Sequence, residues 1–251
     1  MVKALSSKKI GAIIQARMDS TRLPNKVLLN LPYDSKITVL ENIVERARMS
    51  RFLKEIIIAT SNKKEDDAIE NLSKKIKTPC FRGDKHDVLS RYYQAAKKYE
   101  LNHIVRLTGD NPCIDIDIID HAVSFHIKEN NDYTATKNYP AGLNAEVFSF
   151  SALEAAHKNA SRDFEKEHVG PYIYKSNPKK FKINFLEAKK ELKHPEIRVT
   201  LDTEEDYALL CAVFDHLYRG NNFFRIKDIV KLFKQKPWLL MINKKIVHKK
   251  I

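Results

Sequence analysis

Apolar, β-branched runs alternate with helical patterns through the first half of the chain, and this alternation restricts the fold more than any other feature. Four such runs predict buried strands at residues 9–15, 55–60, 78–82 and 103–108. The segments between and after them have helical spacing, at about residues 38–49, 61–75, 87–99 and 116–128. Strands that alternate with helices form βαβ units, so we expect an α/β fold with a mostly parallel, Rossmann-like sheet flanked by helices. Ser61 or Asn62 is a candidate N-cap for the second helix.

The pattern changes after Tyr133, where shorter alternating segments predict a more mixed sheet. The strings YTATK, AEVFSF and KINFLEA look like strands, with helices between them at about residues 151–158 and 164–174. We expect residues 133–197 to form a small acceptor-facing or dimerisation lobe within a single domain that spans residues 1–251. Residues 198–201 predict a strand that returns to the main sheet, and a helix is expected over residues 203–218.

Charge and composition narrow the class of protein. The chain has 251 residues and a net charge of +13, and residues 221–251 hold nine Lys or Arg against one Asp. The remaining basic residues are interleaved with acids, so we expect a basic, solubilising or membrane-proximal C-terminal tail and no specific nucleic-acid binding. No apolar stretch reaches the length of a transmembrane segment, no signal peptide is evident, and three scattered cysteines suit a reducing compartment. A cytoplasmic location is therefore expected.

Polar clusters follow four of the predicted strands, at residues 17–26, 59–62, 108–112 and 202–206. The carboxyl ends of parallel strands meet at one edge of a sheet, where open α/β proteins bind their ligands. We therefore expect the four clusters to converge on one crevice.

The first cluster has the composition of an anion-binding loop. Arg17, Arg22 and Lys26 lie within ten residues, together with hydroxyl groups and a proline. Cations and hydroxyls at this density suit the many acceptor oxygens of a triphosphate. The segment lacks the glycines of a Walker A loop or a dinucleotide fingerprint.

Two aspartates form the second constellation. Asp110 and Asp202 each follow a β-branched run, so both carboxylates should point toward the same crevice. Mg²⁺ prefers one or two carboxylates together with phosphate oxygens and water. The pair is therefore a candidate Mg²⁺ site, with Asp206 as a weaker third member.

The string IIQARMDSTRLPNKVL resembles the N-terminal signature of the cytidylyltransferases that activate 3-deoxy-manno-octulosonate and acylneuraminates, most closely the spore coat polysaccharide biosynthesis protein F group. The similarity continues through RGDKHDVLSRYYQAA, RLTGDNP, YPAGLNAEVFS, EHVGPYIY and RVTLDTEEDY in the family's order. It implies a nucleotide-binding α/β fold, CTP and Mg²⁺ as co-substrates, a sugar acceptor and pyrophosphate as a product. Dimers are frequent in this family, so a homodimer is possible.

The resemblance also implies roles for individual residues. Nucleotide binding falls to Ala16, Arg17, Ser20, Arg22, Lys26, Ala59, Thr60, Asp84, Asp87, Arg91, Thr108 and Gly109. Acceptor binding falls to Gly142, Asn144, Glu146, Glu167 and His168. Metal binding falls to Asp110 and Asp202, and catalysis to Arg17, Lys26 and Asp110.

Several of these positions have a second interpretation or depart from the family pattern. Asp87 is equally a candidate helix cap, and Glu146, in an apolar strand, needs a partner such as a sugar hydroxyl or an Arg. Asp19 would repel a triphosphate unless it points outward or toward the metal. Asn25 replaces a frequent glycine but tolerates positive φ, and Asn144 replaces a commonly acidic residue.

The resemblance, together with the two constellations, leads to the hypothesis that an acceptor hydroxyl attacks the α-phosphorus of CTP in line and displaces pyrophosphate, with an acidic sugar as the acceptor that the resemblance implies. Two alternatives stay open: a metal-dependent glycosyltransferase that uses a nucleotide-sugar, and a nucleic-acid-binding module built on residues 221–251.

Overall fold

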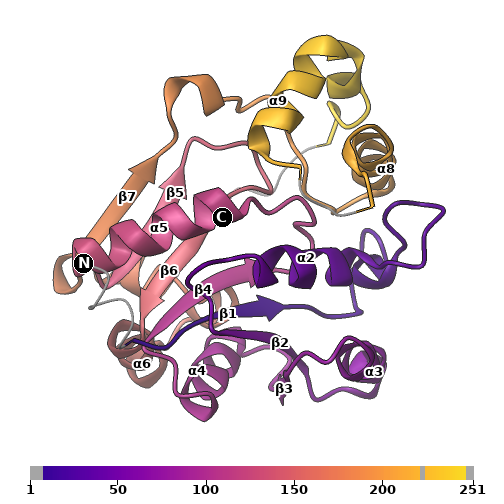
Figure 1. Ribbon diagram of the computed structural model, residues 1–251. Coiled ribbons are helices and arrows are strands. Elements are labelled where there is room, and N and C mark those ends of the chain that lie inside the picture. The colour runs from indigo at the N-terminus through magenta and orange to yellow at the C-terminus, as the bar shows by residue number, and fades with distance from the viewer. Residues whose placement is uncertain (1–7, 221–223, 247–251) are drawn as a thin grey trace.

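A computed structural model describes residues 8–220 and 224–246 of the chain. Within these residues one seven-stranded sheet has the order β3-β2-β1-β4-β6-β5-β7 (Figure 1). The strands are β1 (Ile10–Gln15), β2 (Glu55–Ser61), β3 (Cys80–Gly83), β4 (His103–Thr108), β5 (Tyr133–Lys137), β6 (Glu146–Ser149) and β7 (Ile183–Glu187). All pairs are parallel except the two that β6 makes with β4 and β5. The predicted α/β fold with a mostly parallel sheet is confirmed.

Helices connect the strands close to the predicted positions. They are α2 (Val39–Arg48), α3 (Asp67–Lys75), α4 (Val88–Lys98), α5 (Ile116–Lys128), α6 (Phe150–Asn159), α7 (Asp163–His168), α8 (Glu204–Leu217) and α9 (Ile226–Gln235). Shorter helical turns are η1 (Lys26–Leu28), η2 (Lys64–Asp66), the π-helical η3 (Tyr172–Ser176), η4 (Pro178–Lys180), η5 (Lys190–Leu192) and η6 (Pro237–Met241). The three segments predicted after residue 133 belong to the same sheet as the first four strands.

The beginnings of the helices follow from local capping. Thr38 and Glu41 form a capping box at α2, and the Asp87 carboxylate accepts a hydrogen bond of 2.7 Å from the Ser90 backbone N–H at the start of α4. The predicted cap at Ser61 or Asn62 is wrong. Ser61 ends β2, and its backbone N–H and hydroxyl both donate to the Asp66 carboxylate, which precedes α3.

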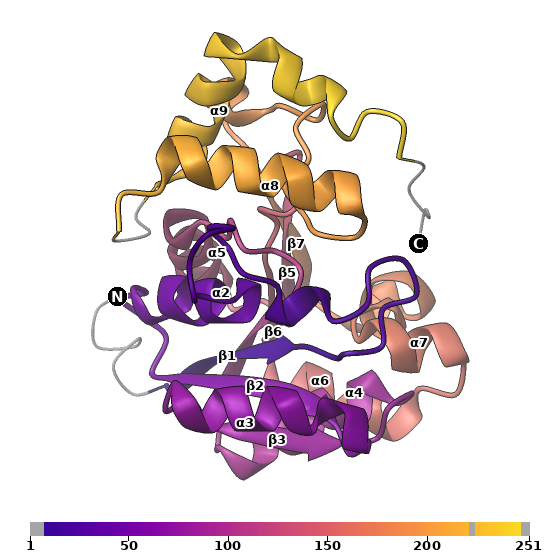
Figure 2. The same ribbon diagram turned by 90° about the vertical axis from the view of Figure 1, so that its right-hand side faces the viewer.

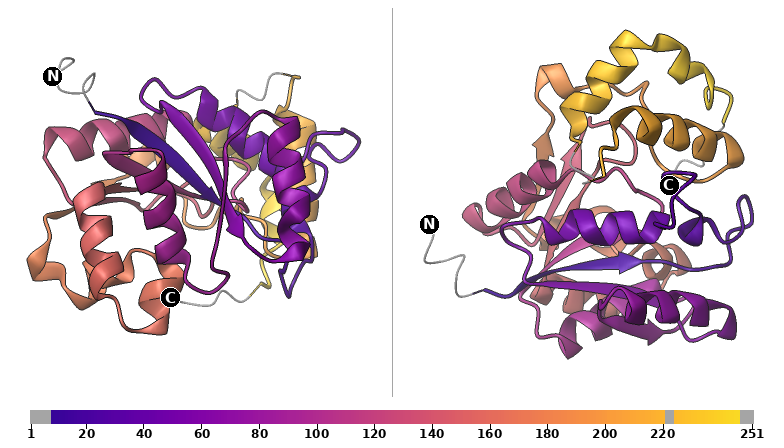
Figure 3. Two further views of the ribbon diagram at one scale, coloured as in Figure 1. Left: turned by 90° about the horizontal axis from the view of Figure 1, so that it is seen from below. Right: turned by 45° about the vertical axis from the view of Figure 1, so that its right-hand side comes forward.

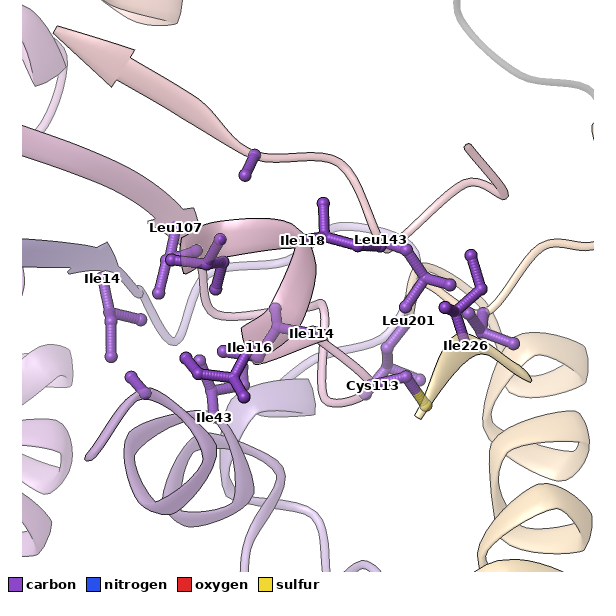
Figure 4. Packing of buried hydrophobic residues seen from close by; sticks show 14 of the residues in the cluster. Ile14, Ile43, Leu107, Cys113, Ile114, Ile116, Ile118, Leu143, Leu201 and Ile226 are labelled. Atoms are coloured by element: carbon purple, nitrogen blue, oxygen red, sulfur yellow. The ribbon is translucent and has the colours of Figure 1, made fainter. Parts of the chain in front are cut away.

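The core lies on both faces of the sheet because successive strand residues point to opposite sides. Ile14 and Leu107 pack with residues of α2 and α5 on one face, and Ile13 packs with residues of α4 and α6 on the other (Figures 1 and 3). Figure 4 shows the hydrophobic residues of the face that carries α2 and α5, near Ile43 and Ile116, at the ends of β1 and β4. This packing holds the strand ends that carry the polar clusters.

Two predictions in the second half are wrong. Residues 198–201 form no strand; Arg198 makes one isolated parallel bridge, to Ala141, outside the named strands. The segment instead passes the end of β4, where the Leu201 N–H donates to the Asp110 carbonyl at 2.8 Å. The helix predicted over residues 164–174 breaks after α7, because Val169 adopts a positive φ of 69° before Gly170 and Pro171.

The basic C-terminal segment is largely part of the folded structure. In the portion the structure describes, α9 buries Ile229, Val230 and Phe233 against the core and lies beside α8, beyond α2 (Figure 2). The lysines of α9 alternate with these apolar residues on the outer side of the helix. None of the described helices has the length and apolar character that a membrane span needs.

Candidate active site

The register of the parallel strands brings two of the polar clusters together. Gln15, the last residue of β1, pairs with Ala59 of β2 and with Thr108 of β4. The next residue in β4's connection, Gly109, donates its N–H to the Gln15 carbonyl at 2.7 Å. A Cβ at Gly109 would lie 3.0 Å from the Ala16 Cβ, so the absence of a side chain allows this close approach.

A cavity of about 380 Å³ opens at this edge of the sheet, and it collects residues from three of the four clusters. Of the residues predicted to form the site, twelve line it: Ala16, Arg17, Ser20, Arg22, Lys26, Arg91, Thr108, Gly109, Asp110, Glu167, His168 and Asp202. We call it the phosphate pocket. The expected convergence of these clusters is confirmed, except for residues 59–62.

Lys26 lies between the two aspartates of the pocket. Its ammonium is 3.0 Å from an Asp110 carboxylate oxygen, 2.9 Å from an Asp202 oxygen and 2.6 Å from the Leu201 carbonyl. Asn25, just before η1, has φ 58° and ψ 15°, a left-handed conformation that Asn tolerates. The turn places Lys26, which belongs to the polar cluster at residues 17–26, in contact with Asp110 and Asp202 of two other clusters.

Further cations surround Asp202. The Arg198 guanidinium lies 2.6 Å from one carboxylate oxygen of Asp202, and Arg22 lies 3.1 Å from the other. Burial alone would raise the pKa of Asp202, but Lys26 and these arginines outweigh it and hold that pKa below its usual range. Asp206 is fully buried and binds Arg198 and the Asp202 N–H, so it supports Asp202 from outside the pocket.

Asp19 is neutralised by neighbouring cations. Its carboxylate lies 2.5 Å from the Lys85 ammonium and 3.4 Å from the Arg17 guanidinium. Lys85 also pairs with Glu65 at 3.0 Å. The ion pairs connect the loop after β1 to the loop after β3 and reduce the repulsion that Asp19 would exert on a bound anion.

The loop after β3 borders a second, larger cavity of about 660 Å³. Asp84 and Asp87 line it, and it shares Arg17 and Glu167 with the phosphate pocket. Asp84 accepts hydrogen bonds from the N–H groups of His86 and Asp87, at 2.7 and 2.8 Å, which lower its pKa, while Asp87 caps α4. The structure therefore places these two acids beside the phosphate pocket.

Arg91, from α4, is a buried cation at the wall of the phosphate pocket. Only 2% of its surface is exposed, and burial lowers its pKa. One guanidinium nitrogen donates to the Asp84 carbonyl at 3.3 Å, while Nε has no partner among the described residues. A guanidinium with unused hydrogen-bonding capacity suits an incoming anion.

Three predicted residues do not line any of these cavities. Ala59 and Thr60 are fully buried within β2, which continues to Ser61, and the Ala59 carbonyl accepts from the Ala16 N–H at 3.1 Å. Gly142 has φ 97° and lies so close to the Val199 backbone that a Cβ would approach it to 2.7 Å. A glycine is therefore required at position 142, both by the positive φ and by the close packing against the Val199 backbone.

A third cavity, of about 260 Å³, contains the other predicted acceptor residues, Asn144 and Glu146. Thr108 lines both this cavity and the phosphate pocket. Glu146 binds the Arg106 guanidinium and the Tyr133 hydroxyl. A sugar hydroxyl or an arginine was expected as its partner, and the structure supplies the arginine.

Sequence reasoning missed Arg106, Asn111 and Arg198. Arg106 interrupts an otherwise apolar strand, HIVRLT, and a cation in such a strand is a usable signal for a site. Asn111 belongs to the motif RLTGDNP, but the sequence alone indicated no role for this residue. Arg198 had no signal, because it was expected to lie in a strand, whereas its partners Asp202 and Asp206 lie four and eight residues ahead, beyond that strand.

A mostly parallel sheet with cations and paired carboxylates gathered at one edge is the architecture of a nucleotide-binding α/β protein. The family model for cytidylyltransferases matches residues 11–246. The chain therefore belongs to the cytidylyltransferase family and is a CTP-dependent nucleotidyltransferase, as the sequence motifs predicted.

Two relatives and one solved structure are similar over most of the chain. An uncharacterised protein of Methanocaldococcus jannaschii is 44% identical and aligns over 96% of this chain and 97% of its own. The spore coat polysaccharide biosynthesis protein SpsF of Bacillus subtilis is 37% identical, over 80% of this chain and 85% of its own. A cytidylyltransferase structure from Leptospira borgpetersenii has a TM-score of 0.85 and 33% identity, and covers 96% of this chain and 100% of its own.

Proposed function

We propose that this protein transfers CMP from CTP to a hydroxyl group of a sugar, with release of pyrophosphate, in the cytoplasmic synthesis of a surface polysaccharide or glycoconjugate. The observation that carries the proposal is the joining of Asp110 and Asp202 by Lys26 beside the cation-rich loop. A separate cavity across Thr108 offers a place for the acceptor. The name of the Bacillus subtilis relative, a polysaccharide biosynthesis protein, supports a sugar as the acceptor.

In the proposed reaction the acceptor oxygen forms a bond to the α-phosphorus of CTP. The bond between that phosphorus and the oxygen bridging to the β-phosphate breaks, pyrophosphate leaves with the electron pair, and the hydroxyl proton passes to solvent. Arg17, Arg22 and Lys26 neutralise charge on the departing pyrophosphate. Positioning and charge stabilisation carry such a reaction, so no covalent nucleophile is required.

The residues of the phosphate pocket fit a divalent cation. Among the described residues no group of three or more His, Cys, Asp or Glu could hold a metal ion alone. Asp110 and Asp202 share one cationic partner, Lys26, and two carboxylates with phosphate oxygens are a donor set that Mg²⁺ accepts. When bound, Mg²⁺ would supply charge neutralisation on the phosphate oxygens.

The charge balance of the phosphate pocket also supports the binding of a divalent cation together with the nucleotide. Its lining has four Lys or Arg, namely Arg17, Arg22, Lys26 and Arg91, and four acids, namely Asp19, Asp110, Glu167 and Asp202. A triphosphate carries up to about four negative charges that this balanced lining cannot fully neutralise. Additional positive charge must accompany the nucleotide.

Pyrophosphate release tests the proposal. Purified protein is incubated with CTP, MgCl₂ and a panel of sugars, and we expect release that depends on one of the sugars. Asp110→Asn should reduce the rate by a factor on the order of 10², because it removes a charge placed beside the reacting phosphate. Asp215→Asn, on the exposed side of α8, is the matched control and should leave the rate unchanged.

Two results would contradict the proposal. One is the absence of sugar-dependent pyrophosphate release together with unaltered CTP binding in Asp110→Asn. The other is transfer of the sugar from a CMP-sugar to an acceptor without use of CTP, which would favour the glycosyltransferase alternative.

A further inference from the structure

Asp66, the last residue of η2 and the residue directly before α3, is a buried acid that lines none of the three cavities. Only 1% of its surface is exposed. An aspartate at this position ordinarily caps the helix that follows, but the Asp66 side chain makes no capping hydrogen bond to α3. Its carboxylate is therefore available to residues outside the helix.

The Asp66 carboxylate joins the segments that follow β1 and β2. One oxygen accepts a hydrogen bond of 2.8 Å from the backbone N–H of Met18, in the cation-rich loop after β1. The other oxygen accepts from the backbone N–H of Ser61, at 3.1 Å, and from the Ser61 hydroxyl, at the end of β2. These donors compensate a charge that is costly to bury without hydrogen bonds. The cation-rich loop is thereby tied to a strand of the sheet.

Met18 is the residue around which the cation-rich loop closes. Its carbonyl accepts hydrogen bonds from the backbone N–H groups of Ser20, at 3.0 Å, and of Asn25, at 3.2 Å. Met18 thus connects the beginning of the loop to its end, and the preceding residue, Arg17, lines the phosphate pocket. Because the Met18 N–H is fixed by Asp66, the placement of the loop depends on a residue outside the pocket.

Asp66 also affects the charge at the wall of the phosphate pocket. Burial lowers the pKa of Arg91, and the Asp66 carboxylate is one of the nearby charges that act in the opposite direction. A carboxylate that does not line the pocket therefore helps Arg91 to stay charged. This contribution has the same direction as the tie to Met18, since both favour the binding of an anion.

We propose that Asp66 is a positioning residue for the triphosphate, and that it fixes the cation-rich loop to the sheet before the nucleotide binds. This inference rests on the proposed function, because it assigns the loop to the phosphates of CTP. A loop that is already ordered loses less conformational freedom on binding than a mobile one, so its order increases affinity. Removal of the Asp66 carboxylate weakens the contacts to the phosphates more than those to the nucleoside.

The affinities of two nucleotides test the inference. The dissociation constants of CTP and CMP are measured by calorimetry with MgCl₂ and without a sugar, and the ratio of the CMP value to the CTP value is the CTP preference. We expect Asp66→Ala to lower this preference at least fivefold, because CMP lacks the two phosphates that the loop would hold. Asp66→Asn, whose amide oxygen can still accept from the Met18 N–H, should retain part of it.

Two further variants separate positioning from general stabilisation. Asp67→Ala removes the next acid along the chain, which pairs with Arg82, and should leave the CTP preference unchanged. Ser61→Ala removes a bond to Asp66 but keeps the one from Met18, so it should lower the stability toward urea without changing the preference. A purely structural role for Asp66 would weaken CTP and CMP binding equally.

Cleavage by trypsin provides a readout that requires no nucleotide. Arg17 and Arg22 are exposed in the cation-rich loop, and a protease cleaves a folded protein where the chain opens locally. We expect Asp66→Ala to increase the rate of cleavage after these two residues at least fivefold, whereas Asp67→Ala should not change it. Mass spectrometry of the fragments identifies the sites.

The outcomes separate the inference from the proposed function. An unchanged CTP preference in Asp66→Ala, or unchanged cleavage after Arg17 and Arg22, overturns the inference and leaves CMP transfer intact. Absence of pyrophosphate release by the unaltered protein with every sugar contradicts the proposed function, and the cleavage rates then decide whether Asp66 fixes the loop. If Asp66→Ala does not fold, Asp66→Ser, whose side chain is one bond shorter than that of aspartate, takes its place with the same expected results.

Discussion

Lys26 is the residue on which the geometry of the phosphate pocket depends. It bonds to Asp110 and Asp202, which lie 84 and 176 positions further along the chain. Its side chain is 12% exposed, and its two carboxylate partners are 29% and 20% exposed. The ammonium therefore compensates two largely shielded negative charges that would otherwise repel each other.

Replacing Lys26 tests this role. Lys26→Met keeps most of the side-chain volume and removes the charge, so the free energy of unfolding should fall by about 1–3 kcal/mol. Urea titration at neutral pH measures the loss. Lys36→Met, at an exposed position, is the control and should change stability little. Equal stability of the two variants would show that Lys26 does not compensate the aspartates.

At the scale of elements, β4 connects the site to the core. Its carboxyl end supplies Thr108 to the phosphate pocket, and Arg106 lines the third cavity, of about 260 Å³. Its amino end carries His103, whose Nδ1 lies 3.1 Å from Nε2 of His126 in α5. Nδ1 of His126 lies 3.0 Å from the Thr134 hydroxyl, so the two buried imidazoles connect β4 and α5 to β5.

These imidazoles predict a loss of stability in mild acid. Burial lowers the pKa of His103 to about 4 and that of His126 to about 3, from an ordinary value of 6.5. Below pH 6.5 the unfolded chain takes up protons that the folded protein does not accept until about pH 4. Stability should therefore decrease as the pH falls through this range, by about 1.4 kcal/mol per pH unit for each imidazole.

Urea unfolding at pH 7 and pH 5 measures the effect. The double variant His103→Gln, His126→Gln should lose most of this pH dependence, whatever its absolute stability. His121→Gln, at an exposed position of α5, should retain it. A double variant with the same pH dependence as the unaltered protein would contradict the assignment.

At the scale of the whole molecule, the parallel sheet gathers loops that are far apart in sequence. Because β1 and β4 run in the same direction and side by side, the segments that follow them meet at one edge. The segment before α8 reaches the same edge by passing the end of β4. The phosphate pocket lies at this edge, and the whole chain has a net charge of +13.

This positive charge predicts salt-sensitive binding of the nucleotide. An anionic ligand is attracted by the net field as well as by the pocket, and dissolved salt screens both. Raising the salt concentration from about 0.05 M to about 0.5 M should weaken CTP binding about tenfold. Calorimetry with CTP measures the change, and cytidine, which lacks phosphates, should show little of it. Equal salt dependence for the two ligands would contradict an electrostatic contribution.

Local sequence was sufficient to identify most elements and the chemistry of the first loop. Strands such as β1 and β4 are nearly continuous apolar runs, and caps such as Thr38 and Asp87 are contacts between near neighbours, so short-range patterns predict them. The cations after β1 and Asp110 after β4 are similarly visible, and their convergence follows from the general rule for open parallel sheets. Asp202 reaches the same edge from a segment that forms no strand.

Tertiary structure decided what each polar side chain contacts. Residues 198–201 have the composition of a strand, but in the folded chain they pass the end of β4 and make one isolated bridge, from Arg198 to Ala141. The pairing of Arg106 with Glu146 depends on the antiparallel register of β6, and the neutralisation of Asp19 depends on Lys85 from a distant loop. The sequence determined the fold class and the kinds of charge at the site, because these depend on local patterns. Which charges remain free to meet a ligand depends on contacts between distant segments, and only the folded chain determines those.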